Sequence, residues 1–362
     1  MPTGIIFIFF VYLSIPWLLN YPAVAYFFYT LISLFGLSQF LKRRPTITAV
    51  ARLSEPRTVR VTFVIPIYNE AENLPALLEN LRINQHPNVS YLFINDASTD
   101  QSADIIAAYG FPVHTVVKQQ YVCDVLNIGA ILAPEESNFI GVLNGDCLLA
   151  QDAIAKMMGR LQWYALDVLN MSNHALPGGT FLAHLEKKFK KELYIYCEAS
   201  LTNGYVLRRT LLNQGWSTIT EDLNLTLQLK AKGLAVHQDP AIVVYDRVPT
   251  SLKTFFRQKY RWVYGDLLNR VVVRPKNVFD LIVNIYYFFP CYTILSLFLP
   301  GIPTQTLVQL QGGIVVLEIL LYSYYLGNIF EALLYGPFQF LFQVYFYFKS
   351  AYNLIKRKKV AW

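Results

Sequence analysis

Four carboxylates in the middle of the sequence have the residue type and the position for chemistry. Asp96 and Asp146 each follow a short apolar run, and Glu221 and Asp222 open a leucine-rich segment. A carboxylate can take a proton from an attacking hydroxyl group, and it can bind a hard cation such as Mg²⁺ or Mn²⁺. General-base chemistry and metal binding are therefore the two kinds of chemistry to consider.

Further candidate residues lie at or just after the ends of apolar runs. They are Pro66, Tyr68, Asn69, Glu70 and Asn144. Each has a simpler interpretation when taken alone, because Asn and Asp after a strand often cap the next helix and acids at a helix start are favoured by the helix dipole. Polar residues after three consecutive apolar runs are harder to explain in this way. They predict a binding site.

The elements that must position these residues follow from the hydrophobic pattern. Apolar, β-branched runs predict strands, and helical spacing of leucines and alanines predicts helices between them. The expected strands are 61–67, 89–94, 113–117 and 139–143, and the expected helices are 71–82, 102–109 and 125–133. This alternation predicts an α/β domain with a parallel-dominated, Rossmann-like sheet and right-handed crossovers. In such sheets ligands bind beyond the carboxyl ends of the strands, which is where the polar residues fall.

The two ends of the chain are much more apolar than its middle. Of the 362 residues, 54% are hydrophobic and only 15% are charged, and no charged residue occurs from 5 to 41. A bilayer needs about 20 apolar residues per helix, so residues 1–44 are predicted to form a transmembrane hairpin that ends in a basic triplet. Three apolar segments within 278–350 are predicted to be further transmembrane segments, followed by a basic tail at 351–362.

Charge separates the middle from the ends. The chain carries a net charge of +7, but 19 of its 24 acidic residues lie between 60 and 250. This distribution favours a cytosolic domain at 45–256 over a nucleic-acid-binding surface. The segment 257–277 is basic and aromatic and is expected to be an amphipathic interfacial helix. Four cysteines without a CxxC pair indicate a reducing compartment.

The order and spacing of these motifs resemble a known family. The motifs are Ile65-Pro66-Ile67-Tyr68-Asn69-Glu70, Asn95-Asp96…Ser98-Thr99-Asp100, Asn144-Gly145-Asp146, Thr220-Glu221-Asp222 and Gln258-x-x-Arg261-Trp262. They are similar to those of the membrane-embedded, processive family 2 glycosyltransferases, which make cellulose, chitin, hyaluronan and poly-N-acetylglucosamine. The resemblance covers about residues 60–270 and implies a nucleotide-sugar-binding domain of the GT-A type.

The resemblance also implies roles. Asp222, with Glu221, would be catalytic. Pro66, Tyr68, Asn69, Glu70, Asp96, Asn144 and Asp146 would bind the donor, with Asp146 as the ligand of Mg²⁺ or Mn²⁺. Gln258, Arg261 and Trp262 would contact the diphosphate or the acceptor.

The implied reaction is inverting β-transfer from a UDP-sugar, with UDP-N-acetylglucosamine preferred, to a growing polysaccharide. Synthesis would be coupled to export across a plasma membrane or bacterial inner membrane. The expected partners are the donor, the polymer, membrane lipid and a small accessory membrane subunit, but no nucleic acid.

Two departures from the family pattern leave alternatives open. Asn144 replaces the first Asp of the usual DxD, and Tyr121-Val122 stands where the family often has Gly-Lys, with Lys118 the nearby cation. Asn127 matches the Asn of the family's Ala-Leu-Asn triplet. The alternatives are the transfer of one sugar to a lipid or short acceptor, and a catalytically degenerate sugar-binding membrane subunit.

Overall fold

The computed structural model describes residues 50–176, 201–213, 215–249 and 251–272, together with single positions between 305 and 353. The chain divides into two compact units, Arg43–Thr250 and a second unit made of Met1–Lys42 with Ser251–Trp362. Within the first unit, the four strands expected from the sequence are present. They are β1 (Val61–Ile67), β2 (Val89–Asn95), β3 (Val113–Thr115) and β4 (Phe139–Val142), and they pair in parallel.

The rest of the sheet is mixed, although six of its eight strands run in the same direction, as expected of a parallel-dominated sheet. The further strands are β5 (Leu148–Leu149), β6 (Val168–Ala175), β7 (Tyr205–Arg208) and β8 (His237–Asp246), and the order of all eight is β3-β2-β1-β4-β7-β6-β8-β5. β7 lies antiparallel to both β4 and β6, β8 is parallel to β6, and the short β5 is antiparallel to β8.

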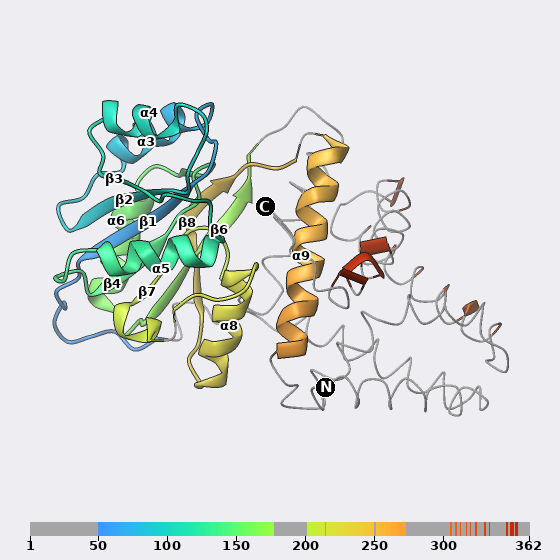
Figure 1. Cartoon of the computed structure of the whole chain (residues 1–362). Helices are drawn as coiled ribbons and strands as arrows, with labels where there is room; N and C mark the ends of the chain where they lie inside the picture. The colour runs from blue at the N-terminus through green and yellow to red at the C-terminus, as the bar shows by residue number, and fades with distance from the viewer. Residues whose placement is uncertain are drawn as a thin grey trace. The chain divides into compact units, whose positions relative to one another are not determined.

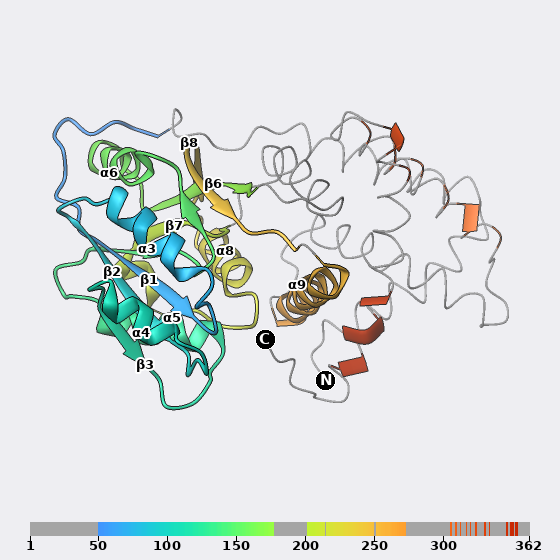
Figure 2. The same cartoon turned by 90° about the horizontal axis from the view of Figure 1, so that it is seen from above.

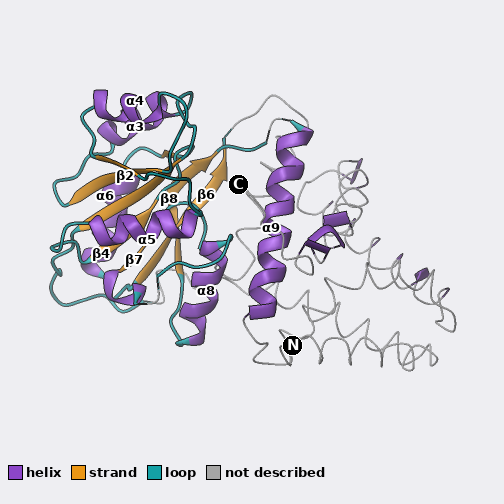
Figure 3. Cartoon of the chain, in the orientation of Figure 1, coloured by secondary structure: helices purple, strands orange, loops and turns teal. Residues whose placement is uncertain are grey.

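Helices cover both faces of this sheet (Figures 1 and 2). They are α3 (Leu74–Ile83), α4 (Ser102–Ala108), α5 (Val122–Leu132), α6 (Ala153–Trp163) and α8 (Glu221–Ala231), with a 3₁₀ turn, η2, at Arg209–Leu212. Figure 3 shows them as purple ribbons against the orange strands. Side chains alternate along a strand, so β1 serves both layers. Phe63 and Ile65 join one core with residues of α3 and α6, such as Leu77 and Met157, whereas Val64 on the other face meets α5.

The helix α5 approaches β1 closely because it carries a glycine at the contact. A Cβ added at Gly129 would lie 2.2 Å from Cγ1 of Val64, nearer than real side-chain carbons come. The missing side chain therefore sets the distance between α5 and the sheet. This distance also fixes the start of α5, which lies among the functional residues described below.

The predicted membrane segments at 1–44 and 278–350, and the basic tail at 351–362, lie outside the continuously described residues. In the part of the chain that the structure describes, no helix combines the length and the apolar character that a membrane crossing needs. The helix α9 (Leu252–Val272) belongs to the second unit and covers most of the segment predicted to be amphipathic, 257–277.

Candidate active site

Six strands of the first unit end at the same edge of the sheet. The strands β1 to β4 are parallel, and β7 is antiparallel to both β4 and β6, so β6 runs in the same direction as β4. Because β8 is parallel to β6, its carboxyl end also reaches this edge, where β7 begins. The loops at this carboxyl edge contain most of the predicted donor-binding residues and the predicted metal ligand Asp146.

The loops after β1 and β2 are tied to each other. Asn69 has a left-handed backbone conformation with φ of 54°, and its Oδ1 accepts a hydrogen bond of 2.8 Å from the backbone N–H of Thr99. The N–H of Asn69 donates in turn to Oγ of Ser98 at 3.0 Å. The structure therefore shows Asn69 holding two loops together. Its predicted contact with the donor stays a prediction.

Asp100 fastens the same two loops at a second point. Its carboxylate accepts hydrogen bonds from the N–H of Ala71 and from both the N–H and the hydroxyl of Ser102. Slight burial alone would raise the pKa of Asp100, but these hydrogen bonds outweigh it and lower the pKa. Asp100 is thus held ionised as an anchor of the loops.

Glu70 lies between the loops that follow β1 and β4. Its N–H donates to Oγ of Ser102 at 2.9 Å, and its carboxylate accepts a hydrogen bond from Asn73. A Cβ added at Gly145 would lie 3.4 Å from Cγ of Glu70, which places this side chain against the loop of the predicted metal ligand. Burial raises the pKa of the Glu70 carboxyl, whereas the hydrogen bond from Asn73 and the positive charge of Arg247 lower it. Pro66 and Tyr68, both partly buried, complete the end of β1.

Asp96 carries a buried oxygen that has no partner. The residue is 3% exposed, its N–H donates to the carbonyl of Ile67 at 2.7 Å, and its Oδ1 accepts a hydrogen bond of 2.7 Å from the N–H of Gln120. Its Oδ2 is buried and accepts no hydrogen bond. Burial raises the pKa of Asp96, partly offset by the hydrogen bond from Gln120. An unsatisfied buried acceptor costs free energy, so it indicates a place kept for a donor on a ligand.

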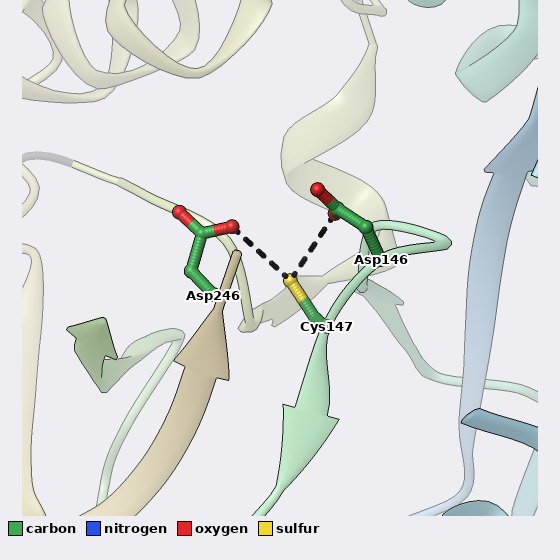
Figure 4. Close-up of side chains that lie close together, drawn as sticks. All are labelled: Asp146, Cys147 and Asp246. Carbon is green, nitrogen blue, oxygen red and sulfur yellow. Dashed lines mark hydrogen bonds between the residues drawn. The ribbon is translucent and has the colours of Figure 1, made fainter. Parts of the chain in front are cut away.

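In the loop after β4, the structure brings Asp146 close to Cys147 and to Asp246, a carboxylate that the sequence analysis did not identify. Cys147 is fully buried, and its sulfur lies 3.8 Å from Oδ1 of Asp146 and 3.9 Å from Oδ1 of Asp246, so that its one thiol hydrogen can be donated to either carboxylate (Figure 4). One ligand atom from each of the three residues lies within 4.8 Å of the others. Asp246 is the last residue of β8, and a signal for it exists in the sequence, because it follows the apolar run Ile242–Val244 as Asp146 follows β4.

This group of residues fits a hard divalent cation. Two carboxylates are the ligands that Mg²⁺ and Mn²⁺ prefer, and only they need to bind it. Asn144 is engaged elsewhere, since its amide donates to Oδ1 of Asn203 in the loop before β7. Asp246 therefore supplies the second carboxylate that Asn144 does not.

Glu221 and Asp222 form the first turn of α8, close to the start of β7. Their negative charges act on Tyr205, whose pKa is raised well above its usual range, chiefly by complete burial and then by these two carboxylates. Burial, with the charges of Asp124 and Glu221, raises the pKa of Cys123 at the start of α5 to about 11. Glu221 thus faces both the first turn of α5 and the first residue of β7, which places the start of α8 at the carboxyl edge.

Asn127 fixes the loop that leads into α8. Its side chain donates to the carbonyl of Trp216 at 2.9 Å and accepts from the N–H of the same residue at 2.8 Å. The indole of Trp216 donates to the hydroxyl of Tyr205 at 2.7 Å. Asn127 matched a family motif, and the structure gives it a positioning role in this chain: it connects α5 to the segment that carries the two acids.

The remaining predicted residues lie on α9, in the second unit. Gln258, Arg261 and Trp262 lie within little more than one turn of this helix, and the ammonium group of Lys259 lies 4.0 Å from the ring centre of Trp262. Each unit is defined by itself, so the contact of these three residues with diphosphate or acceptor stays a prediction.

Comparison with known families agrees with this arrangement. The family described as Glycosyl transferase family 2 matches residues 62–219, and Glycosyl transferase family group 2 matches residues 181–350. The chain therefore carries family 2 glycosyltransferase domains, and it is a glycosyltransferase.

Individual relatives are distant. The poly-beta-1,6-N-acetyl-D-glucosamine synthase of Staphylococcus aureus is 21% identical over 224 residues, which cover 57% of this chain and 54% of that protein. The probable glycosyltransferase YdaM of Bacillus subtilis is 22% identical over 274 residues, covering 64% of this chain and 62% of that protein. The chain thus spans between half and two thirds of the length of these curated relatives.

A solved structure shows the same fold over nearly the whole chain. It is the mannosyltransferase PcManGT of Pyrobaculum calidifontis, in complex with GDP-Man and Mn²⁺. The likeness has a TM-score of 0.60 at 16% identity and covers 95% of this chain and 99% of that one. The fold is accordingly a mixed α/β fold of the GT-A type.

Proposed function

We propose that this glycosyltransferase adds sugar units from a UDP-activated donor, preferably UDP-N-acetylglucosamine, to a growing polysaccharide with inversion at the anomeric carbon. The observation that carries the proposal is the carboxyl edge of the sheet. There, an unpartnered buried acceptor on Asp96, a pair of hard ligands on Asp146 and Asp246, and the acids at the start of α8 occur together. The likeness to a poly-N-acetylglucosamine synthase supports the choice of sugar.

Asp96 and the loops tied by Asn69 would bind the nucleoside. The Oδ2 of Asp96 can accept the imide N–H of uracil, which would satisfy a buried oxygen that has no hydrogen-bond partner among the residues that the structure describes. A guanine base also carries N–H donors, so this contact alone does not select uridine. The donor must therefore be identified by experiment.

Asp146 and Asp246 would hold Mg²⁺ or Mn²⁺. When bound, such an ion supplies positive charge to the diphosphate as it leaves. PcManGT is described with Mn²⁺, which supports a divalent cation in this chain as well. The sulfur of Cys147 lies within hydrogen-bonding distance of both carboxylates, and its thiol hydrogen can be donated to one of them.

Asp222 would act as the general base. The acceptor hydroxyl gives its proton to the Asp222 carboxylate while its oxygen bonds to the anomeric carbon. The bond from that carbon to the diphosphate oxygen breaks, and UDP leaves with the electron pair. A single displacement of this kind inverts an α-linked donor to a β-glycoside.

Polymerisation and membrane location are parts of the same proposal. Gln258, Arg261 and Trp262 would contact the diphosphate or the sugar at the end of the polymer, and the apolar segments at 1–44 and 278–350 would anchor the enzyme in a plasma membrane or bacterial inner membrane. The apolar composition of those segments supports this location. Resistance to alkaline extraction of the membrane fraction tests it, and release into the supernatant would contradict it.

The donor and product are tested with one set of reactions. Membranes that contain the full chain are given Mn²⁺ and labelled UDP-N-acetylglucosamine, UDP-glucose or GDP-mannose, and the products are sized on a gel. We expect long products from UDP-N-acetylglucosamine that a β-specific hexosaminidase digests. A product with one added sugar would instead identify a single-transfer enzyme, and labelled nucleotide binding without sugar transfer would identify a degenerate subunit.

A further inference from the structure

Arg247 extends from the carboxyl edge directly beside the predicted metal ligands. It follows Asp246, whose carbonyl accepts the N–H of Leu176 at 2.8 Å, so strand pairing holds the backbone in place up to this point. The Arg247 side chain is exposed, whereas Asp246 beside it is buried. The sequence analysis did not assign Arg247 a function.

The electrostatic surroundings make a cation here unusual. The loops that follow the described strand ends at this edge carry Glu70, Asp96, Asp100 and Asp146, with Asp246 at the end of β8. In the same described loops the basic side chains are Lys118, after β3, and Arg247. A nucleoside diphosphate is itself strongly negative, and one divalent ion offsets only part of this charge. A second cation is needed near the metal ligands for the diphosphate to enter.

Asp246 and Glu70 indicate that the charge of Arg247 lies at the part of the carboxyl edge that holds the predicted metal ligands. Asp246 precedes it in the chain and lies near Asp146, and Glu70 interacts with its positive charge. Glu70 in turn packs against the position of Gly145, the residue before Asp146. Arg247 is therefore flanked by the loops of β1, β4 and β8, and Lys118 lies in the loop that contacts Asp96 through Gln120.

We propose that Arg247 is a donor-binding residue that pairs with the diphosphate of the nucleotide sugar. A guanidinium group presents planar donors that match two phosphate oxygens at once, and it keeps its charge at any physiological pH. This inference rests on the proposed use of a nucleotide-sugar donor, and it adds a specific residue to that donor site.

Comparing two ligands on the full-length protein in detergent with Mn²⁺ tests the inference. UDP contains the diphosphate and uridine lacks it, so isothermal titration of both separates phosphate binding from base binding. In Arg247→Ala we expect UDP affinity to fall by about 10- to 100-fold, the effect of losing a hydrogen-bonded charge, with uridine affinity unchanged. Arg247→Lys should recover part of the loss. Arg82→Ala, which removes an exposed cation from the last turn of α3, should leave both affinities unchanged.

Two results would overturn the role of Arg247 while leaving the proposed function intact. One is unchanged UDP affinity in Arg247→Ala. The other is an equal loss of UDP and uridine affinity, which would show that the residue supports the loops rather than the diphosphate. If the unsubstituted protein bound neither ligand, the proposed function would fail, and the assignment of Arg247 with it.

Discussion

Burial has opposite outcomes at two carboxylates of the carboxyl edge, Asp96 and Asp100. Asp100 is tied by several hydrogen bonds that lower its pKa, whereas burial dominates at Asp96 and raises its pKa. The folded-state pKa of Asp96 therefore lies above its unfolded-state value. Above the folded-state pKa, the buried charge of Asp96 lowers the free energy of unfolding by its full amount. As the pH falls through the folded-state pKa toward the unfolded-state value, the carboxyl is protonated and this loss of stability disappears. The Asp96 carboxylate therefore lowers the stability of the fold. This is expected of a binding residue whose hydrogen bonds are completed only by a ligand.

Asp96→Asn tests this balance between stability and binding. The amide removes the buried charge, so we expect thermal stability at neutral pH to be equal to or higher than that of the unsubstituted protein. The amide N–H₂ cannot accept the N–H of the base as the carboxylate does, so uridine affinity should fall by about tenfold or more. Titration calorimetry and thermal melting measure the two effects.

The matched control for Asp96 is Asp104→Asn, at an exposed position in α4. It should change neither quantity. A loss of stability in Asp96→Asn without any loss of uridine affinity would show that the carboxylate is structural.

Asp246→Asn tests the second metal ligand. Removing one of two carboxylates should weaken Mn²⁺ binding at least as much as the loss of an outer partner of a metal ligand, by about 10- to 100-fold. The paramagnetic resonance signal of free Mn²⁺ measures this without any turnover. Asp152→Asn, an exposed acid in a left-handed conformation that asparagine tolerates, is the control. Equal Mn²⁺ affinity in all three proteins would remove Asp246 from the metal site.

At the scale of elements, the site depends on where α5 and the start of α8 are held. Asn127→Ala leaves both the N–H and the carbonyl of Trp216 without their partner. We expect a loss of about 1–3 kcal/mol in unfolding free energy, the usual cost of unsatisfied buried groups. Because the loop of Trp216 leads into the catalytic acids, kcat should also fall, while KM for the donor changes little.

The control for Asn127 has the same bonding pattern at the other edge of the sheet. Asn138 donates to the carbonyl of Thr58 and accepts from the N–H of Arg60, both at 2.9 Å, at the start of β4. Asn138→Ala should lower stability somewhat but leave kcat unchanged. If the two variants had the same kcat, Asn127 would be no more than a packing residue.

The effect of Gly129→Ala on the free energy of unfolding should depend on the side chain at position 64. Alanine is favoured over glycine inside a helix by about 1 kcal/mol, but overpacking a core contact costs about 1–3 kcal/mol. Gly129→Ala should therefore destabilise the protein by chemical denaturation, because its Cβ would overlap Val64. In a Val64→Ala background the overlap is gone, and the same substitution should be neutral or stabilising. Additive effects of the two substitutions would show that α5 does not rest on Val64.

The same elements show what the sequence could predict. β1, β2 and β4 are continuous apolar runs, so these strands, and the positions of the motif-carrying loops at their ends, were predictable. β6 and β8 contain polar residues such as Asn170 and Gln238 that are buried in the sheet. Because these residues interrupt the apolar pattern, the sequence did not predict β6 and β8 as strands. The position of β7 between β4 and β6 depends on long-range pairing, which no local pattern encodes. Asp246 and Arg247 were missed because their strand was missed.

At the scale of the whole molecule, the chain combines an acidic catalytic unit with apolar ends. Some of the carboxylates between 60 and 250, such as Glu70, Asp96 and Asp146, lie in the loops of one sheet edge, and basic residues flank the apolar segments. This division is the one expected of the proposed membrane-bound polysaccharide synthase. In the mixed sheet, β6 and β8 bring their carboxyl ends to the same edge as β1 to β4, so six strand ends meet there instead of four.

Asp222→Asn tests the central claim most directly, in the full-length protein with Mn²⁺ and UDP-N-acetylglucosamine. The account predicts that the variant binds UDP with unchanged affinity while its rate of sugar transfer falls by about 10²- to 10⁴-fold, the usual contribution of a general base. Transfer at the unsubstituted rate by a folded, UDP-binding Asp222→Asn protein would contradict it.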